Sequence, residues 1–503
     1  MLVETGSMAG VPPTYNPSMD SHEPEFDPED AGETAYGELD PPEAVDLEPA
    51  EAVSEEWNRL RSAKGFLPGD PLSGELVPPA SKSVAQRWIL AALLAEGRTE
   101  ISNLSDGADV QHALGVVQRC ARSFERAEPR ACRIEGHPPS AHAGPTPSGG
   151  APLAVGESGT LSRLATAALA LAGDPMTPIT LRPEGTLLMR KSLPLFDALE
   201  GAGVCLVRQN LPGTWPVTLV PTRKPGELQL DKPISSQELS GLLLGLAAFD
   251  EPGCVHVSGK LPSAPYVALT LRALLDFGVE VHVDHPEPGQ FRYHVRGPLR
   301  APAEPLVIEP DASAAAVGLA AACISGGEVR VALREDTAQG DVGIIEHLRE
   351  FGCRGTHEDG YLSAGGLPAR GVDLDLDGEP DLAPPLAAVA AAVALTRGES
   401  SVLRGLGTLS GKESDRLQGL CDGLNQSGFR AECGSDVLHI KPGPHGVDPV
   451  LLDPHSDHRM AFAFALLSLL RPGIKVVEPQ CVEKSWPRFW QDMVGLGARL
   501  TTL

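Results

Sequence analysis

The chain has 503 residues, a formal net charge of −26 and only 4% aromatic residues. This length allows two or three domains, and the acidic balance argues against a nucleic-acid partner, which would need a basic face. No apolar run approaches the length of a membrane span, and nine scattered cysteines without a CxxC pair indicate reduced thiols in a cytoplasm rather than a disulfide framework or a zinc site.

The first 56 residues hold 16 acidic residues and no lysine or arginine. They show no apolar periodicity, which predicts a disordered acidic tail over residues 1–63. The segment lacks the basic start of a secretory signal, and transit peptides are poor in acids. It is either a solvated extension without a function of its own or a tail that binds a partner.

Six segments then open alike and recur at intervals of 77, 77, 76, 70 and 76 residues. Each begins with a serine or aspartate, continues through an apolar run rich in alanine and leucine, and reaches a glycine or proline before a short β-like stretch. This pattern predicts a capped, buried helix followed by a strand, repeated six times. The openings are Ser81, Ser158, Ser235, Asp311, Asp381 and Asp457.

Several helix N-termini aimed at one cleft would form a site for anions, because a helix start carries free N–H groups and partial positive charge. The alternative is a repeat that only builds a core, with its caps exposed. Basic residues favour the anion site, since Lys82, Arg163, Arg416 and Arg459 all lie in or near the openings.

The repeats suggest two domains of three units each. A strand-like segment at 74–80 leads into the first unit, residues 81–309 hold units one to three, and residues 64–80 with 310–503 hold the others. The stretch 137–152 reads as a flexible loop of low complexity. Two chain crossings, near residues 80 and 310, predict a hinge. Glycine-rich nucleotide loops are missing from the sequence, so neither a dinucleotide nor ATP is expected.

Two local motifs leave alternatives open. In KESDR (412–416), Lys412 and Arg416 would share one helical face, either as ligand-binding groups or as a solvated helix start with internal ion pairs. In HSDHRM (455–460), His455 and His458 invite a metal site, but the spacing is weak and no third ligand is evident. Arg459 at a helix start is the better candidate for binding.

The ordered motifs PPASKSVAQR, GESGTLSR, MRKSLPLFDALEGAGV, ISSQELSGLL, GEPDLAPPLA, GKESDRL, SDHRMAFAF and EKSWPRFW resemble those of the 5-enolpyruvylshikimate-3-phosphate synthase family. The resemblance covers residues 74–503, and KESDR and DHRM are its most specific elements. It implies an α/β (α+β) enolpyruvyl-transferase fold of two domains, each with three βαβαββ units, whose helix N-termini face the interdomain cleft.

The resemblance also implies the roles of individual residues. The catalytic residues would be Lys82, Asp381, Glu413 and Lys484, with Glu413 as the general acid. Shikimate 3-phosphate, the hydroxyl acceptor, would bind Lys82, Ser83, Arg87, Ser235, Ser236, Ser263, Tyr266, Asp381 and Lys412. Phosphoenolpyruvate would bind Lys82, Gly159, Arg190, Gln237, Arg416, Arg459 and Lys484.

The implied reaction adds the 5-hydroxyl of shikimate 3-phosphate to C2 of phosphoenolpyruvate and then eliminates phosphate. A carboxylic acid must protonate the methylene, a base must take the hydroxyl proton, and clustered lysines and arginines must hold two polyanions. No metal and no organic cofactor is expected. We expect a cytoplasmic monomer whose partners are these two small molecules, with no nucleic acid and no membrane.

Five positions depart from the common family pattern: Glu157, Leu164, Lys191, Ala264 and Thr408. They leave open a diverged transferase for another hydroxyl acceptor. A relative that acts on a UDP-sugar normally has Lys-Asn where this chain has Lys82-Ser83, and a cysteine that segment 183–195 lacks. A non-catalytic anion-binding protein on the same scaffold would not need Asp381, Glu413 and Lys484 together.

Overall fold

The computed structural model describes residues 62–139, 144–208, 211–224, 226–444, 446 and 448–502. The chain divides into two units, Met1–Ala52 and Val53–Leu503, and every described residue belongs to the second. The predicted acidic tail therefore lies almost wholly outside the described residues, as do residues 140–143 of the predicted loop 137–152.

The strands of the described chain form six four-stranded sheets, as the repeats predicted. Three sheets take all their strands from residues 81–309, which we call the inserted half. The first sheet contains β14 (Leu306–Val307), β3 (Arg98–Ser102), β5 (Ala131–Glu135) and β4 (Ser123–Glu128); the second contains β6 (Leu153–Gly156), β7 (Ile179–Pro183), β9 (Val217–Val220) and β8 (Cys205–Arg208); the third contains β10 (Glu227–Asp231), β11 (Gly253–Ser258), β13 (Gln290–Val295) and β12 (Val281–Asp284).

The other three sheets draw on residues 64–80 and 310–502, which we call the split half. They contain β16 (Arg354–Glu358), β17 (Tyr361–Gly365), β15 (Glu328–Ala332) and β2 (Ser73–Glu75); β18 (Asp373–Asp375), β19 (Ser401–Arg404), β21 (Val437–Lys441) and β20 (Arg430–Cys433); and β22 (Val450–Leu452), β23 (Ile474–Val476), β1 (Lys64–Leu67) and β24 (Arg499–Thr502).

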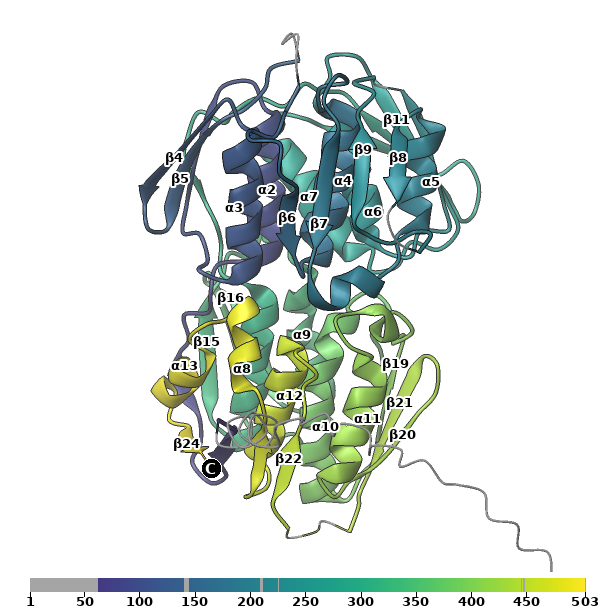
Figure 1. Cartoon of the computed structure of the whole chain (residues 1–503). Helices are drawn as coiled ribbons and strands as arrows, with labels where there is room; N and C mark the ends of the chain where they lie inside the picture. The colour runs from purple at the N-terminus through teal and green to yellow at the C-terminus, as the bar shows by residue number, and fades with distance from the viewer. Residues whose placement is uncertain are drawn as a thin grey trace, which may run out of the picture. The chain divides into compact units, whose positions relative to one another are not determined.

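Each sheet is accompanied by two α-helices, and the first of each pair is the helix that opens a repeat (Figure 1). These opening helices are α2 (Lys82–Leu94), α4 (Gly159–Ala172), α6 (Ser236–Leu246), α8 (Ala312–Ser325), α10 (Ala383–Arg397) and α12 (His458–Ser468). The second helices are α3 (Ala108–Cys120), α5 (Leu193–Gly201), α7 (Pro265–Asp276), α9 (Ile344–Glu350), α11 (Arg416–Gln426) and α13 (Phe489–Gly495). Short 3-10 turns are η1 (Gly185–Met189), η2 (Gly340–Gly343), η3 (Pro380–Leu382), η4 (Leu409–Gly411) and η5 (Pro479–Lys484).

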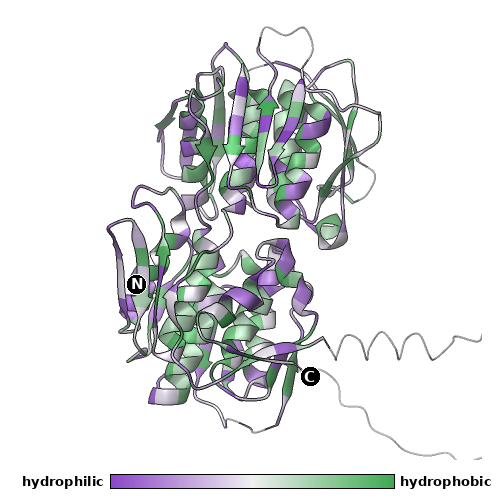
Figure 2. Cartoon of the chain, turned by 90° about the vertical axis from the view of Figure 1, so that its left-hand side faces the viewer, coloured by the Kyte–Doolittle hydropathy of each residue, from purple (hydrophilic) through white to green (hydrophobic). Residues whose placement is uncertain are grey.

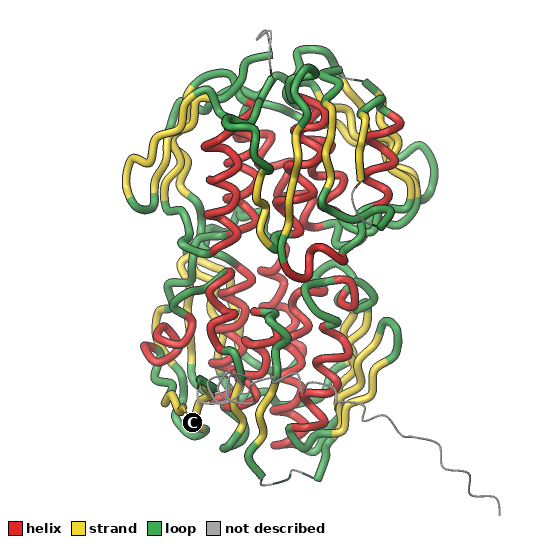
Figure 3. The backbone as a smooth tube through the Cα atoms, viewed as in Figure 1, coloured by secondary structure: helices red, strands yellow, loops and turns green. Residues whose placement is uncertain are grey.

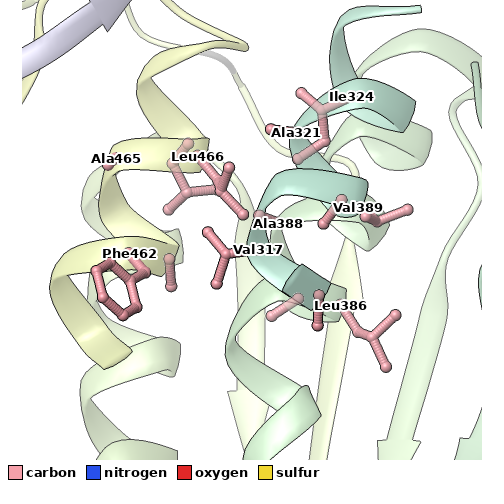
Figure 4. Packing of buried hydrophobic residues seen from close by; sticks show 14 of the residues in the cluster. Val317, Ala321, Ile324, Leu386, Ala388, Val389, Phe462, Ala465 and Leu466 are labelled. Carbon is pink, nitrogen blue, oxygen red and sulfur yellow. The ribbon is translucent and has the colours of Figure 1, made fainter. Parts of the chain in front are cut away.

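The opening helices lie inside each half, and the sheets lie at its outer faces (Figure 3). Apolar colouring accordingly gathers in the interior, and polar colouring on the outward loops and strands (Figure 2). In the split half α8, α10 and α12 pack side by side through residues such as Val317, Val389 and Leu466 (Figure 4). The helices α8 and α10 are rich in alanine, whereas Phe462 of α12 packs against the rings of Trp486 and Phe489.

Five of the six predicted helix caps are confirmed. The side chains of Ser81, Ser158, Ser235, Asp311 and Asp457 each accept a hydrogen bond from a backbone N–H in the first turn. These bonds satisfy donors that an uncapped helix would leave free.

The prediction that Asp381 caps the remaining helix, α10, was wrong. Asp381 lies inside η3, and α10 begins at Ala383 without a side-chain cap. The first turn contains Pro384 and Pro385, which have no N–H to donate, so the Asp381 carboxylate is released for other partners.

The predicted strand at 74–80 is also shorter than expected. β2 ends at Glu75, since Pro78 and Pro79 cannot donate to a sheet. The chain then crosses into the inserted half beside its return path, where the Ser81 N–H donates to the Glu309 carbonyl and the Asp311 N–H to that of Pro79. Both crossings therefore lie side by side.

Candidate functional site

A cavity of about 970 Å³ receives side chains from both halves of the described chain. Its walls include the N-terminal ends of several opening helices, as the repeat pattern predicted. The predicted site residues that line it are Lys82, Ser83, Arg87, Gly159, Arg190, Ser235, Gln237, Ser263, Tyr266, Asp381, Lys412, Glu413, Arg416 and Arg459. The two others are Ser236, which is buried at the start of α6, and Lys484, which lies behind Glu413.

Asp381 is surrounded by three cations. Its carboxylate lies 2.9 Å from Arg416 Nη1, 3.3 Å from Lys412 Nζ and 3.5 Å from Arg459 Nη2. Burial alone would raise the pKa of Asp381, but these cations outweigh it and hold the pKa far below its usual range. Asp381 is therefore an ionised acceptor that fixes three basic side chains around one point.

The segment before α11 differs from the predicted helix. Residues 412–415 are not helical, and Asp415 caps α11 by accepting a hydrogen bond from the Gln418 N–H at 3.1 Å. Lys412 and Arg416 consequently do not share a helical face, yet both reach Asp381 because the turn directs them inward.

Glu413 lies at the boundary of the two halves with its side chain 11% exposed. Its carboxylate is 3.1 Å from His458 Nδ1 and 3.7 Å from Lys484 Nζ. Burial would raise its pKa, but His458, Arg416 and Lys82 together hold the pKa well below the usual range of a glutamate. In the free protein Glu413 is thus a carboxylate, not a carboxylic acid.

Arg416 is held rigidly by a fully buried acid. Its Nε and Nη2 atoms donate to the two carboxylate oxygens of Asp457 at 2.7 and 3.1 Å. This bidentate pairing fixes the guanidinium plane and leaves Nη1 for Asp381.

The predicted HxxH motif does not bring its histidines together, since His455 is exposed beside Asp453 whereas His458 is buried beside Glu413. Within the described residues, Glu413, Asp457 and His458 do lie close enough to share an ion. The Asp457 oxygens, however, already accept hydrogen bonds from Arg416, Ser414 and the Arg459 N–H. This occupation makes Asp457 a poor metal ligand.

Lys82 stands at the first turn of α2, and its ammonium pairs with Asp109 at 2.9 Å. Asp109, in the first turn of α3, is 5% exposed and was not singled out from the sequence. Burial lowers the pKa of Lys82, but Asp109 and Glu413 outweigh it and raise the pKa above its usual value. Lys82 is therefore charged, and the buried Asp109 orients its ammonium group.

Three groups around Gly159 form a second basic region. A Cβ at position 159 would lie 3.0 Å from Arg190 Nη1, so a side chain here would push into that guanidinium. Arg163 Nη1 donates to Gln237 Oε1 at 2.9 Å, which orients the Gln237 amide. Arg190 Nε is buried and has no hydrogen-bond partner among the described residues. An anion at this point would supply that partner.

Another part of the cavity wall is built around Tyr266 and Arg87. Arg87 donates to Thr270 Oγ1 and to the carbonyls of Ser83 and Tyr266, and its burial lowers the pKa to about 10. The Tyr266 hydroxyl donates to Asp341 at 2.8 Å and lies 3.5 Å from Asp381.

Asp341 is a further acid that the sequence analysis missed. Burial raises its pKa to about 6, and Ser313 also donates to its carboxylate. The only signal was an acid in the otherwise unremarked stretch QGDVG (339–343).

The helices of the described chain include none that is both long and apolar enough to span a membrane. The family model described as EPSP synthase (3-phosphoshikimate 1-carboxyvinyltransferase) matches residues 67–493. Relatives named 3-phosphoshikimate 1-carboxyvinyltransferase include one from Serratia proteamaculans, 32% identical across 84% of this chain and 96% of the relative. Another, from Nitrosomonas europaea, is 34% identical across the same shares.

Solved structures of similar fold cover nearly the whole described chain. The EPSP synthase of Acinetobacter baumannii superposes with a TM-score of 0.69 at 24% identity, covering 88% of this chain and all of that one. The enolpyruvyl transferase NikO from Streptomyces tendae gives 0.63 at 17% identity, covering 88% and 99%. These likenesses confirm the predicted two-part fold of six small sheets.

Proposed function

Because this chain belongs to the EPSP synthase family, we propose that it moves the carboxyvinyl group of phosphoenolpyruvate to the 5-hydroxyl of shikimate 3-phosphate and releases phosphate. The observation that carries this proposal is one cavity in which two carboxylates, Asp381 and Glu413, are surrounded by basic groups from both halves. An anion-binding protein without catalysis would gain nothing from two acids in such a place.

In this proposal shikimate 3-phosphate lies against the inserted half. Its phosphate would receive hydroxyl hydrogen bonds from Ser235 and Ser263, whereas the buried Ser236 would act from the helix start. Asp381 and Lys412, 3.3 Å apart, would hold the attacking 5-hydroxyl. Thr408 also lines the cavity, and its buried hydroxyl has no hydrogen-bond partner among the described residues.

Phosphoenolpyruvate would lie between the halves, with its two anionic groups on the remaining basic side chains. The unpartnered Arg190 Nε, the oriented Gln237 amide and the open face of Gly159 support one side of this placement. Arg416 and Arg459, both fixed by acids, support the other. Such preorganised charges stabilise the leaving phosphate as it departs.

To act as the acid, Glu413 must be protonated, whereas in the free protein it is ionised. Its low pKa comes from Lys82, Arg416 and His458. A bound phosphate and carboxylate would neutralise these cations, so the pKa of Glu413 would rise and the group would take up a proton. Glu413 would then protonate the methylene carbon C3, while the 5-hydroxyl gives its proton to Asp381 and its oxygen bonds to C2. Return of a C3 proton to Glu413 would break the bond between C2 and the phosphate oxygen and release phosphate.

The test is a phosphate-release assay. Purified protein with phosphoenolpyruvate should release phosphate only when shikimate 3-phosphate is also present, and a carboxyvinyl ether of the acceptor should form in equal amount. Phosphate release without the acceptor, or none with both substrates, would contradict the proposal. A UDP-sugar in place of the acceptor serves as the control for the alternative substrate.

We also expect the two halves to close on the ligands. Basic side chains line the cavity from both halves, among them Arg190 and Lys412, and one of the ion pairs that join the halves, Lys260–Asp377, is exposed and therefore weak. Anions that bridge the walls should therefore shift the population toward a closed form. Small-angle scattering should give a smaller radius of gyration with shikimate 3-phosphate, and phosphoenolpyruvate should bind more tightly after it. An unchanged radius with independent binding would rule this out.

The monomeric state and the cytoplasmic location are part of the same proposal. One chain supplies every group assigned above, so the site does not require a second copy. All nine cysteines are free thiols, a state that a reducing compartment maintains.

A further inference from the structure

Glu157 makes an ion pair that crosses between the halves. It lies in the inserted half, directly after β6 and before the cap of α4, and its carboxylate contacts Lys484 Nζ in η5 of the split half. The two side chains are 24% and 19% exposed, so the pair is largely shielded from solvent. Shielding makes this interaction stronger than a surface ion pair.

The backbone around Glu157 holds its carboxylate in position. The Thr186 N–H donates to Glu157 Oε1 at 3.2 Å. Gly185, with a φ of +53°, leaves space that a Cβ would fill, because a side chain there would collide with Oε1. Glu157 is therefore seated in a niche of η1 and does not reach Lys484 by chance.

Lys484 in turn has its charge fully compensated without any ligand. Besides Glu157, its ammonium lies 3.7 Å from Glu413 and donates to the Ser456 carbonyl at 2.8 Å. Burial lowers its pKa, but Glu413 and Glu157 outweigh this and raise it. The carboxylate of Glu157 thus stands where an anionic group of a substrate would pair with Lys484.

We propose that Glu157 is a built-in competitor of phosphoenolpyruvate: its carboxylate occupies Lys484 in the free enzyme and must give it up when the substrate binds. The inference rests on the proposed function, together with the binding of phosphoenolpyruvate by Lys484 that the family resemblance implies. Glu157 then sets the affinity for this substrate and takes no part in proton transfer. The same loop links it to a second binding group, since Thr186 Oγ1 accepts a hydrogen bond from Arg190.

The test replaces Glu157 by glutamine, which keeps the side-chain length and the Thr186 hydrogen bond but removes the charge. With shikimate 3-phosphate saturating, the KM for phosphoenolpyruvate should fall about three- to tenfold while kcat stays within about twofold. Glu184→Gln is the matched control: it removes the same charge from an exposed neighbour of Gly185 without a cap hydrogen bond, and should leave KM unchanged.

A second measurement keeps the inference testable should catalysis be disturbed. Calorimetric titration of phosphoenolpyruvate into the enzyme with a 5-deoxy analogue of shikimate 3-phosphate, which cannot react, should show the same gain in affinity for Glu157→Gln and Glu157→Asn. A KM that is unchanged or raised, or an affinity that does not improve, would overturn the proposal. Wild-type enzyme that releases no phosphate would instead refute the proposed function, so the two failures are distinguishable.

Discussion

Replacement of Glu413 by glutamine is expected to lower kcat at least about a hundredfold, because the amide cannot donate the proton that the methylene carbon must receive. Glutamine keeps the size of the side chain and can still contact His458, so the cavity should keep its shape. The substitution also removes a negative charge that the folded state stabilises, since the pKa of Glu413 is lowered on folding. A modest fall in melting temperature at neutral pH should therefore accompany the loss of activity.

The matched control is Glu432→Gln, which removes a glutamate that also pairs with a lysine, Lys441, but on the surface of β20. It should change neither kcat nor stability appreciably. Measuring the number of protons taken up when phosphoenolpyruvate binds tests directly whether Glu413 becomes protonated. Wild-type enzyme should take up a proton when phosphoenolpyruvate binds to the 5-deoxy acceptor complex, and Glu413→Gln should take up less. Near-wild-type turnover in Glu413→Gln would show that Glu413 is not the general acid.

Lys82→Met should also reduce turnover at least about a hundredfold, by loss of a fixed positive charge beside the reacting groups. Lys82 is 2.9 Å from Asp109, and it contributes to the low pKa of Glu413. Without Lys82, the buried Asp109 has lost its ion-pair partner, so some loss of stability is expected as well. Steady-state kinetics with both substrates, together with a thermal melt, measures the two effects.

Lys441→Met provides the comparison for this variant, because it removes an ion-paired lysine outside the cavity. A second variant, Lys82→Met with Asp109→Asn, should recover stability but not turnover. Recovery of turnover in the double variant would mean that Lys82 serves only to neutralise Asp109. The assignment of Lys82 as a catalytic residue would then be wrong.

The helices and their openings could be predicted because cap, apolar run and stop residue are all local in the sequence. Five caps follow this rule, and the sixth fails for a reason also visible there, since Pro384 and Pro385 deprive Asp381 of its donors. The helical spacing assigned to KESDR was wrong because a nearer signal competes with it. Asp415 with Gln418 starts the helix one turn later.

The partners of the site residues could not be predicted from spacing. Asp109 meets Lys82 from the second helix of the same repeat, whereas Asp457 meets Arg416 and Glu157 meets Lys484 from different repeats. Such pairs depend on how the repeats pack and on which half a side chain faces. The sequence therefore indicated which groups bind anions, but not which acids hold those groups in place or compete for them.

The order of the strands has a consequence for how the chain folds during its synthesis. The inserted half can complete all three of its sheets from one continuous stretch, whereas the split half needs β1, whose Phe66 N–H donates to Ser468 across 402 positions. Closing so long a loop is slow and costs entropy. Once the inserted half has folded, however, Lys82 and Asp311, 229 positions apart, are already joined. The inserted half, once folded, thereby brings β2 close to β15, which is made next, and leaves β1 to pair with β23 and β24, which are made last.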